Sequence, residues 1–519
     1  TLRADRNSNL VCQTHCIARF TGPFSQINHD PNVPFNQMFT NYHSLFPDIE
    51  KVSFQPRIGF AWNPWGRSNT VVRGGVGLFT DLYPATLADQ YALNSPTSNR
   101  FTFRPPTPMP ISPADVANPL GAPVGTQIAT CNSLFNSTYT GGGTVADYVN
   151  AATAQFGAKC AIPDFNSILP HTVANPKYLE WNVEIQQSIG QKTSVSLNYV
   201  GNRGSDLFVN NPWPNAWAGG FGTFTGLPDA APDTRVNNVI ELTNNGRSNY
   251  NGVTASVTRR LTKGFQGSIN YTWSHALDDV SNGGVSPFSI NDSLYYQFNP
   301  AGLDVQNYSN ADYDVRHNLS ASYVWDLPFK SSNGFLNQVI GGWTVSGTFF
   351  ARTGYPFTPY DGLPGQVLGN SLGVLTGLPA QWNGTGPTSC GHPAVDSTGA
   401  IVPCLDANAQ FPVSFNVTET GFSTTRRNLF RGPNYFNSDL DLLKRFKITE
   451  RANFAVGANF YNILNHPNFA TPNADVNEFF ASDFGKITST AVPATSIYGA
   501  FVGSSVSGRV VQLHARFEF

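Results

Sequence analysis

The sequence predicts an all-β fold. Three observations carry this prediction: the composition, the period of the hydrophobic residues, and the lengths of the connections. Charged residues make up only 12% of the 519-residue chain, whereas aromatic residues make up 13%. The chain also contains 47 Gly and 37 Pro residues. Aromatic side chains favour strands, and Gly and Pro favour turns. The composition therefore indicates many strands joined by many turns, and it does not indicate helices.

Eleven segments alternate between apolar and polar residues, which is the pattern of a strand with two different faces. In one of them, Leu179 and Trp181 alternate with Glu180 and Asn182. The strands are predicted to have about ten residues each, the length of a tilted transmembrane strand. The alternating residues that mark them lie within residues 52–62, 72–78, 179–189, 195–199, 253–261, 265–273, 319–327, 343–349, 436–442, 454–460 and 511–519. Weaker candidates lie near residues 101–103 and 236–242.

Turn residues separate strands that follow each other closely. Asn, Pro and Gly occur within residues 63–66, and Gly occurs within residues 190–191 and 263–264. Thr449 and Glu450 lie in the short connection between the predicted strands at 436–442 and 454–460. These segments predict hairpin turns.

Short and long connections alternate along the chain. A bacterial outer-membrane barrel has short periplasmic turns and long extracellular loops, and connections this long are uncommon in a compact soluble domain. The sequence therefore predicts a transmembrane antiparallel β-barrel of the outer-membrane type, surrounded by outer-membrane lipid. The predicted extracellular loops are residues 81–177, 203–248, 277–316, 353–435 and 465–507.

Aromatic residues gather near both ends of the predicted strands, as they do at the two interfaces of a barrel in lipid. Trp62, Trp325, Trp343, Phe446 and Phe519 lie near periplasmic ends, and Trp181, Tyr199, Trp273 and Phe460 lie near extracellular ends. Arg259 and Lys444 lie on the apolar face, where their long stems are expected to reach the lipid headgroups. The alternative is a soluble sandwich, in which the same aromatic residues would form a core.

The topology can be counted back from the last strand, because bacterial barrels keep both chain ends in the periplasm. This count assigns residues 1–51 to an extracellular loop and residues 52–519 to the barrel. Eleven is also an odd number of strands, whereas bacterial barrels usually have an even number. We therefore expect further strands before residue 1.

Several motifs together resemble the Oar-like TonB-dependent receptors that are common in acidobacterial genomes. The motifs are FQPRIGFAWNPWG at 54–66, TVVRGGVGLF at 70–79, YNGVTASVTRRL at 250–261, YTWSHALDD at 271–279, DYDVRHNL at 312–319, DLPF at 326–329, GGWTVSG at 341–347 and FYNILNHPNF at 460–469. The resemblance covers residues 52–519 with gaps in the long loops. One departure is Val315, where the family usually has arginine.

The resemblance implies a barrel of 22 strands filled by an N-terminal plug that contacts the TonB complex. Neither the plug nor the TonB box is present in this sequence. The implied activity is uptake of a large ligand, such as an oligosaccharide, a peptide or a metal chelate, through the lumen. The last strand, with Phe517 and Phe519, resembles the signal read by the barrel-assembly machinery.

The six cysteines form three local pairs, which favours disulfides in an oxidising compartment. Zinc binding is the alternative at the first pair, but no second ligand pair follows at zinc-finger spacing. The pairs are Cys12 and Cys16, Cys131 and Cys160, and Cys390 and Cys404.

No catalytic residue and no cofactor is predicted. The sequence has no H-E-x-x-H motif, no phosphate-binding loop and no G-x-S-x-G motif. The near balance of 31 basic and 33 acidic residues also excludes nucleic-acid binding through bulk positive charge.

Polar and aromatic residues nevertheless mark candidate contacts with a plug or a ligand. The candidates for the lumen are Glu180, Glu184, Asp314, Arg316, His317, Asp439, Asp441 and Arg516. Trp213, Trp217 and Trp382 are candidates for stacking on a ligand, with packing inside the loops as the alternative. Asp278, Asp279, Asn282 and Asp292 offer oxygen ligands of the kind that calcium prefers.

Other functions remain open from the residues alone. A barrel without a plug would be a passive porin. A surface adhesin or a structural outer-membrane protein, and a soluble all-β binding module, are further alternatives.

Overall fold

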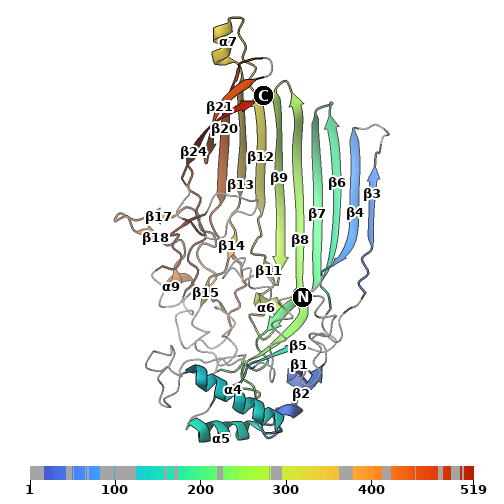
Figure 1. The fold of residues 1–519 in the computed structure, drawn as a ribbon, viewed down its shortest axis with the longest axis vertical. Coiled ribbons are helices and arrows are strands. Elements are labelled where there is room, and N and C mark those ends of the chain that lie inside the picture. Colours follow the sequence, from blue (N-terminus) through green and yellow to red (C-terminus); the bar gives the residue numbers. More distant parts are fainter. Residues whose placement is uncertain are drawn as a thin grey trace.

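The computed structural model gives the chain a long sheet at one end and a folded region at the other (Figure 1). It describes residues 17–42, 50, 52–64, 66, 69–81, 99, 124–156, 160–168, 174–218, 226–279, 281, 295–361, 378–411, 422–449, 452–476, 483–491, 503–504 and 508–518.

Eleven strands of the described part follow one another across a single antiparallel sheet. They are β3 (Arg57–Trp62), β4 (Thr70–Thr80), β6 (Lys177–Ile189), β7 (Thr193–Asn211), β8 (Val239–Thr262), β9 (Phe265–Asp278), β12 (His317–Asp326), β13 (Trp343–Arg352), β20 (Tyr435–Lys447), β21 (Asn453–Tyr461) and β24 (Val510–Glu518). Each predicted strand appears, and each pairs with its neighbours in the sequence. The predicted all-β fold is confirmed, although β7 and β8 extend well into the segment 203–248.

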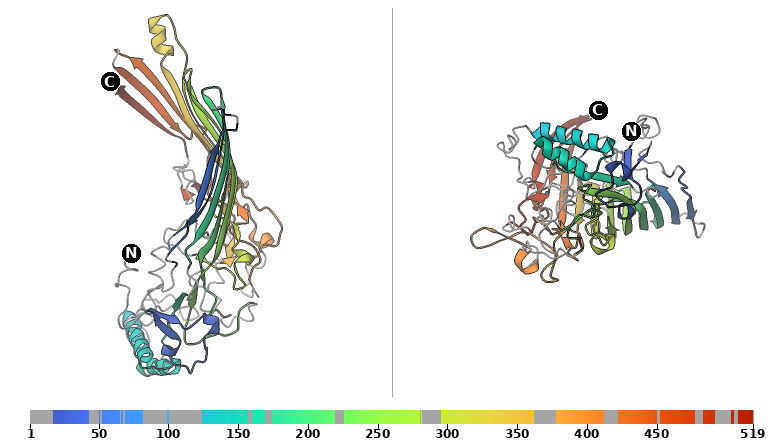
Figure 2. Two further views of the ribbon diagram at one scale, coloured as in Figure 1. Left: turned by 90° about the vertical axis from the view of Figure 1, so that its right-hand side faces the viewer. Right: turned by 90° about the horizontal axis from the view of Figure 1, so that it is seen from below.

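The sheet is curved and open. In the view from below it forms an arc with β3 at one end and β24 at the other (Figure 2). Within the described residues, these two edge strands do not pair with each other.

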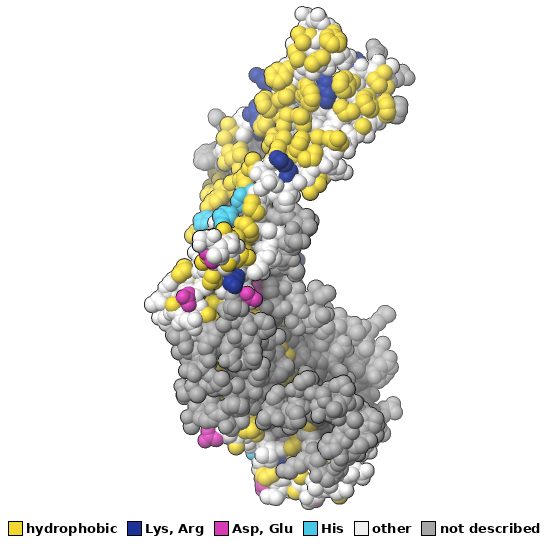
Figure 3. Space-filling view, turned by 90° about the vertical axis from the view of Figure 1, so that its left-hand side faces the viewer, with side chains coloured by type: hydrophobic (Ala, Val, Ile, Leu, Met, Phe, Trp, Pro, Cys, Tyr) yellow, Lys and Arg dark blue, Asp and Glu magenta, His cyan; other side chains and the backbone are white. Residues whose placement is uncertain are grey.

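The two faces of the arc differ in chemistry because side chains alternate along each strand. On β6, Leu179, Val183 and Ile185 lie on the convex face and are exposed, whereas Glu180 and Glu184 lie on the concave face. Hydrophobic side chains cover the outer surface of the β24 end of the arc (Figure 3). This is the pattern of a barrel wall between lipid and an aqueous lumen.

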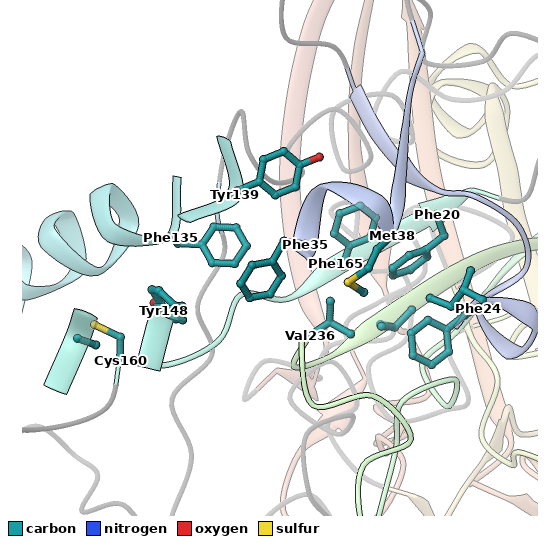
Figure 4. Close-up of a cluster of buried hydrophobic side chains, with 13 residues drawn as sticks. Phe20, Phe24, Phe35, Met38, Phe135, Tyr139, Tyr148, Cys160, Phe165 and Val236 are labelled. Atoms are coloured by element: carbon teal, nitrogen blue, oxygen red, sulfur yellow. The ribbon is translucent and has the colours of Figure 1, made fainter. Parts of the chain in front are cut away.

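The long connections fold into a compact region, which we call the cap: the described parts of residues 17–42, 124–168, 212–238, 279–316, 353–434, 462–491 and 503–504. One part contains β1 (Ile17–Phe20), β2 (Phe39–Tyr42), α4 (Val124–Thr140), α5 (Val145–Phe156) and β5 (Phe165–Ile168). Aromatic side chains from these elements and from the segment between β1 and β2, which contains Phe35, point toward one another (Figure 4).

A second part of the cap packs around Phe411 and Phe430, which are both fully buried. Its elements are short: β14 (Pro356–Phe357), β15 (Tyr360–Asp361), β16 (Leu378–Pro379), β17 (Ala394–Val395), β18 (Ile401–Val402), α9 (Ala407–Gln410), β19 (Phe430–Arg431), β22 (Thr490–Ala491) and β23 (Gly503–Ser504). Between the two parts lie β10 (Tyr295–Tyr296), α6 (Leu303–Gln306) and β11 (Ser309–Asn310).

The expectation of no helices is wrong for the segment 81–177, which contains α4 and α5. Both helices bury aromatic residues, such as Phe135 and Tyr148, against the rest of the cap. Tertiary packing therefore stabilises both helices, although the sequence of α4 is rich in Thr, Asn and Ser; α5 is rich in Ala, which favours a helix. No helix of the described residues is long and apolar enough to cross a membrane.

One further helix, α7 (Gly334–Ile340), lies in the connection between β12 and β13, at the end of the sheet away from the cap (Figure 1). Its carbonyl groups at Val339 and Gly341 accept hydrogen bonds from Lys444 Nζ. Lys444 is buried because its side chain contacts the helix. The expectation that it reaches the lipid headgroups is therefore wrong.

Candidate functional site

The concave wall of the sheet carries short polar side chains. Ser268 and Ser322 hydrogen bond across neighbouring strands at 3.0 Å, and Thr254 and Thr272 do so at 2.9 Å. The wall contains a hollow of about 610 Å³, whose polar lining includes Thr258, Gln266, Ser268, Ser322, Ser346, Thr348, Asp439, Asp441 and Asn459. Such a wall accommodates water and hydrophilic molecules.

Asp441 joins three strands of this wall. Its carboxylate accepts a hydrogen bond from the Ser346 hydroxyl at 3.2 Å and lies 3.3 Å from His514 Nε2. The carboxylate stands between the hydroxyl and the imidazole, whereas a nucleophilic serine needs direct contact with its base. The arrangement therefore supports binding of polar groups, not acyl transfer.

Four other predicted lumenal residues, Glu180, Glu184, Asp439 and Arg516, also lie on the concave face. They are spread over β6, β20 and β24. Asp439 accepts a hydrogen bond from the backbone N–H of Asn462 at 2.8 Å. The wall thus distributes its charges, and these residues do not form one compact site.

A second polar cluster lies just before β12. The buried Asp314 carboxylate accepts hydrogen bonds from Arg316 Nε at 3.0 Å and from Arg431. His317 does not join this cluster. Its Nδ1 lies 2.8 Å from the Tyr271 hydroxyl, on the same face as the outward apolar residues. The structure therefore brings two of the three predicted residues together and separates the third.

Arg427 forms a buried ion pair beside this cluster, and the sequence patterns do not predict it. Its guanidinium is fully buried and pairs with Asp278 and Asp312, the latter at 3.5 Å. It also donates hydrogen bonds to the backbone carbonyl of Asn307 and to the Ser281 hydroxyl. Because Asp278 and Arg427 are 149 residues apart, local spacing carries no signal of this contact.

Asp279 lies beside this ion pair in a different environment. Burial raises the pKa of its carboxyl to about 6, although a hydrogen bond from the backbone N–H of Arg247 at 2.9 Å opposes the shift. Asp278 and Asp279, which the sequence suggests as calcium ligands, instead lie beside the guanidinium groups of Arg427 and Arg247. Among the described residues, no group of three His, Cys, Asp or Glu residues is arranged to hold a metal ion. Asn282 and Asp292 lie outside those residues.

Two of the three candidate stacking residues pack against aromatic residues of the cap. Trp213 is buried and lies edge-on to Phe422, with ring centroids 4.9 Å apart. Trp382 packs edge-on against Phe430 at 5.6 Å. Trp217 is half-buried. Trp213 is therefore packed inside the cap, whereas Trp382 and Trp217 are partly exposed, and stacking on a ligand stays a prediction for them.

Two cysteine pairs lie in the cap in bonding geometry. Cys131 and Cys160 join α4 to the segment before β5, with Cα atoms 5.8 Å apart. Cys390 and Cys404 close the base of the β17–β18 hairpin, with Cα atoms 5.5 Å apart. The remaining pair, Cys12 and Cys16, lies outside the described residues.

Phe517 lies on the outward face of β24, where its ring centroid is 4.7 Å from that of Phe454. It is exposed there, so it contributes to the apolar surface at the edge of the sheet. Phe519 lies outside the described residues.

Comparison with known families identifies the family to which the chain belongs. Residues 6–512 match a family model described as an outer membrane beta barrel domain. The chain belongs to this family. As an outer membrane β-barrel domain, it resides in the bacterial outer membrane, and its convex apolar face lies against lipid.

Solved structures of outer-membrane transporters are similar to this chain over part of their length. The outer membrane transporter YddB from Escherichia coli is 10% identical, with a TM-score of 0.37, over 89% of this β-barrel domain and 40% of that chain. The FrpB iron transporter from Neisseria meningitidis is 9% identical, with a TM-score of 0.35, over 91% and 40%. This chain thus spans about 40% of the length of these structures. Among curated proteins, none matches it.

Proposed function

We propose that the chain is the barrel portion of a TonB-dependent outer-membrane transporter that takes up a large ligand through its lumen. The observation that carries this proposal is the combination of a polar concave wall with a folded cap at one end of it. Loops held on a rigid scaffold are a common place for ligand recognition. A hydroxyl-rich wall then offers hydrogen-bond partners to a hydrophilic cargo, such as an oligosaccharide, a peptide or a metal chelate.

The width of the arc supports the same proposal. Eleven strands form an open arc, and barrels of 16 or more strands enclose a channel or a plugged lumen. We propose that further strands close the barrel between β24 and β3, and that a plug in the lumen contacts TonB. The predicted lumenal residues Asp314, Arg316 and Arg516 would then help to hold the plug or the ligand.

The proposed function can be tested by uptake from a complex mixture. Cells that carry the complete gene and cells that lack it are given an extract of oligosaccharides, peptides and metal chelates, with and without a protonophore. Active transport predicts that specific components disappear from the medium only when both the gene and the proton gradient are present. Depletion of many small solutes without the gradient would instead show a passive porin. No depletion, together with gene-dependent attachment of cells to a surface, would show an adhesin.

The barrel-assembly machinery is a further proposed partner, through the last strand. Deletion of Phe519 is expected to lower the amount of heat-modifiable protein in the outer membrane, because the terminal aromatic residue forms part of the proposed signal. Wild-type amounts after this deletion would contradict the proposal.

A further inference from the structure

The helix α7 has an apolar face that no other part of the described chain covers. Its seven residues read GFLNQVI, so Phe335, Leu336, Val339 and Ile340 lie on one side at helical spacing. Asn337 and Gln338 lie on the other side. The Asn333 side chain accepts a hydrogen bond from the backbone N–H of Leu336 at 3.1 Å and so begins the helix.

The C-terminal end of α7 is fixed to the lipid-facing side of the sheet. Lys444 Nζ donates to the carbonyl groups of Val339, at 3.3 Å, and of Gly341. Trp343 Nε1 also donates to the Val339 carbonyl, at 3.0 Å. Trp343 and Lys444 are paired across β13 and β20 and lie on the outward face. A positive charge at the C-terminal carbonyls is favourable for a helix.

The exposed apolar side chains of α7 continue the outward apolar surface. Phe335 is 82% exposed, Leu336 46% and Val339 51%, and no residue of the helix is buried. The helix contains no charged residue. Phe329 and Trp325, in the same connection and at the adjoining strand end, are exposed as well. Figure 3 shows that hydrophobic side chains extend up to this tip of the molecule.

We propose that α7 is an interfacial helix that inserts its apolar face into the acyl chains of the periplasmic phospholipid leaflet. The short turns of an outer-membrane barrel face the periplasm, which places α7 at that leaflet. A helix of seven residues is too short to be stable in water by itself, so its attachment through Lys444 and Trp343 is what positions it at the interface. This inference rests on the family and not on the transport proposal.

Photocrosslinking in outer membranes tests the inference directly. A benzophenone amino acid replaces Phe335 in the complete protein, and the same probe at Gln338, exposed on the polar side of the helix, serves as the matched control. Heat-modifiable migration confirms assembly of each variant. We expect about tenfold more phospholipid adduct from position 335 than from position 338, because only the apolar side of the helix meets acyl chains. The probe at Leu336 repeats the test if the first variant does not assemble.

Two results would overturn the inference. Equal lipid adduct from positions 335 and 338 would show that the apolar face does not enter the leaflet. A crosslink from position 335 to a protein would show that a periplasmic partner covers the helix instead. In a Lys444→Met variant, the lipid adduct at position 335 is expected to fall toward the level at position 338.

Discussion

The sheet and the cap place their large apolar side chains in opposite environments. Along the strands, residues such as Leu179 and Leu513 point outward and remain exposed in the isolated chain. In the cap, Phe35, Phe411 and Phe430 are fully buried. The difference shows that the two regions face different surroundings. Lipid covers the outward side chains of the strands, whereas the cap has to bury its own apolar side chains away from water.

The charged groups follow the same division. The cap buries Arg235 and Arg427 completely, and each pairs with aspartate. The concave wall of the sheet leaves polar groups such as His514 and Asp441 partly exposed. Because burial of an unpaired charge is costly, the cap depends on its ion pairs far more than the sheet does.

The largest expected effect comes from breaking the buried ion pair of the cap. Replacement of Arg427 by methionine leaves Asp278 and Asp312 without their common partner, at an expected cost of about 3–5 kcal/mol to the cap. Urea-dependent proteolysis of the cap in outer membranes measures this loss. The sheet is expected to keep its heat-modifiable migration.

The neighbouring Arg426 provides the matched control, because its side chain is exposed. Arg426→Met is expected to change cap stability by less than about 0.5 kcal/mol. Equal sensitivity of the Arg427→Met and Arg426→Met variants to protease would contradict the role of the buried pair.

A charge on the lipid-facing side of the sheet should have the next largest effect. Val183 lies in the middle of β6 on the convex face, and Asn182 is its neighbour on the concave face. Val183→Arg is expected to cost about 2–4 kcal/mol in a bilayer, because arginine then faces hydrocarbon. Asn182→Arg is expected to have little effect. Reversible unfolding in lipid vesicles measures the free energy of unfolding of both variants. A larger loss for Asn182→Arg than for Val183→Arg would mean that the two faces have been assigned the wrong way round.

The disulfide between Cys131 and Cys160 should stabilise only the cap. Serine at both positions is expected to lower cap stability by about 2–4 kcal/mol, because the unfolded loop gains freedom. Mass mapping without reduction should find the two cysteines joined. Alkylation of both under those conditions would show that they are free thiols.

The smallest expected effect is a dependence of cap stability on pH through Asp279. Its pKa is raised to about 6 in the folded cap. Near pH 5 the carboxyl is therefore mostly protonated in the folded cap and mostly ionised in the unfolded chain. Lowering the pH from 7 to 5 should therefore stabilise the cap by about 1 kcal/mol at this position. Asp279→Asn should remove this contribution, measured as the difference between the two unfolding curves. An identical pH dependence in both proteins would exclude it.

The sequence predicts the strands well because alternation is a local signal. On β6, the apolar residues from Leu179 to Ile189 mark the outward face, with Gln187 as the exception, and a similar alternation marks the other strands of the sheet. The terminal strand and the short turns follow from the same pattern. Lipid on one side and water on the other impose this period directly on the residues.

The cap could not be predicted in the same way, because its contacts connect distant segments. Arg427 meets Asp278 across 149 residues, and Phe20 packs on Phe165. The helix α4 is poor in strong helix formers and depends on such packing, whereas α5 is rich in alanine, which favours a helix locally. Lys444 shows the same limit on the sheet, because the sequence places it on the apolar face but does not reveal that α7 covers it.

The central claim is that the convex face of the sheet meets lipid and the concave face meets water. The most direct test is a series of single spin labels at residues 179–189 of β6 in lipid vesicles, with Cys12 and Cys16 replaced by serine. Accessibility to oxygen reports lipid, and accessibility to a water-soluble nickel chelate reports the lumen. We predict that the two signals alternate with period two and opposite phase, with Val183 exposed to oxygen. Access of the nickel chelate to successive positions without alternation would contradict the claim.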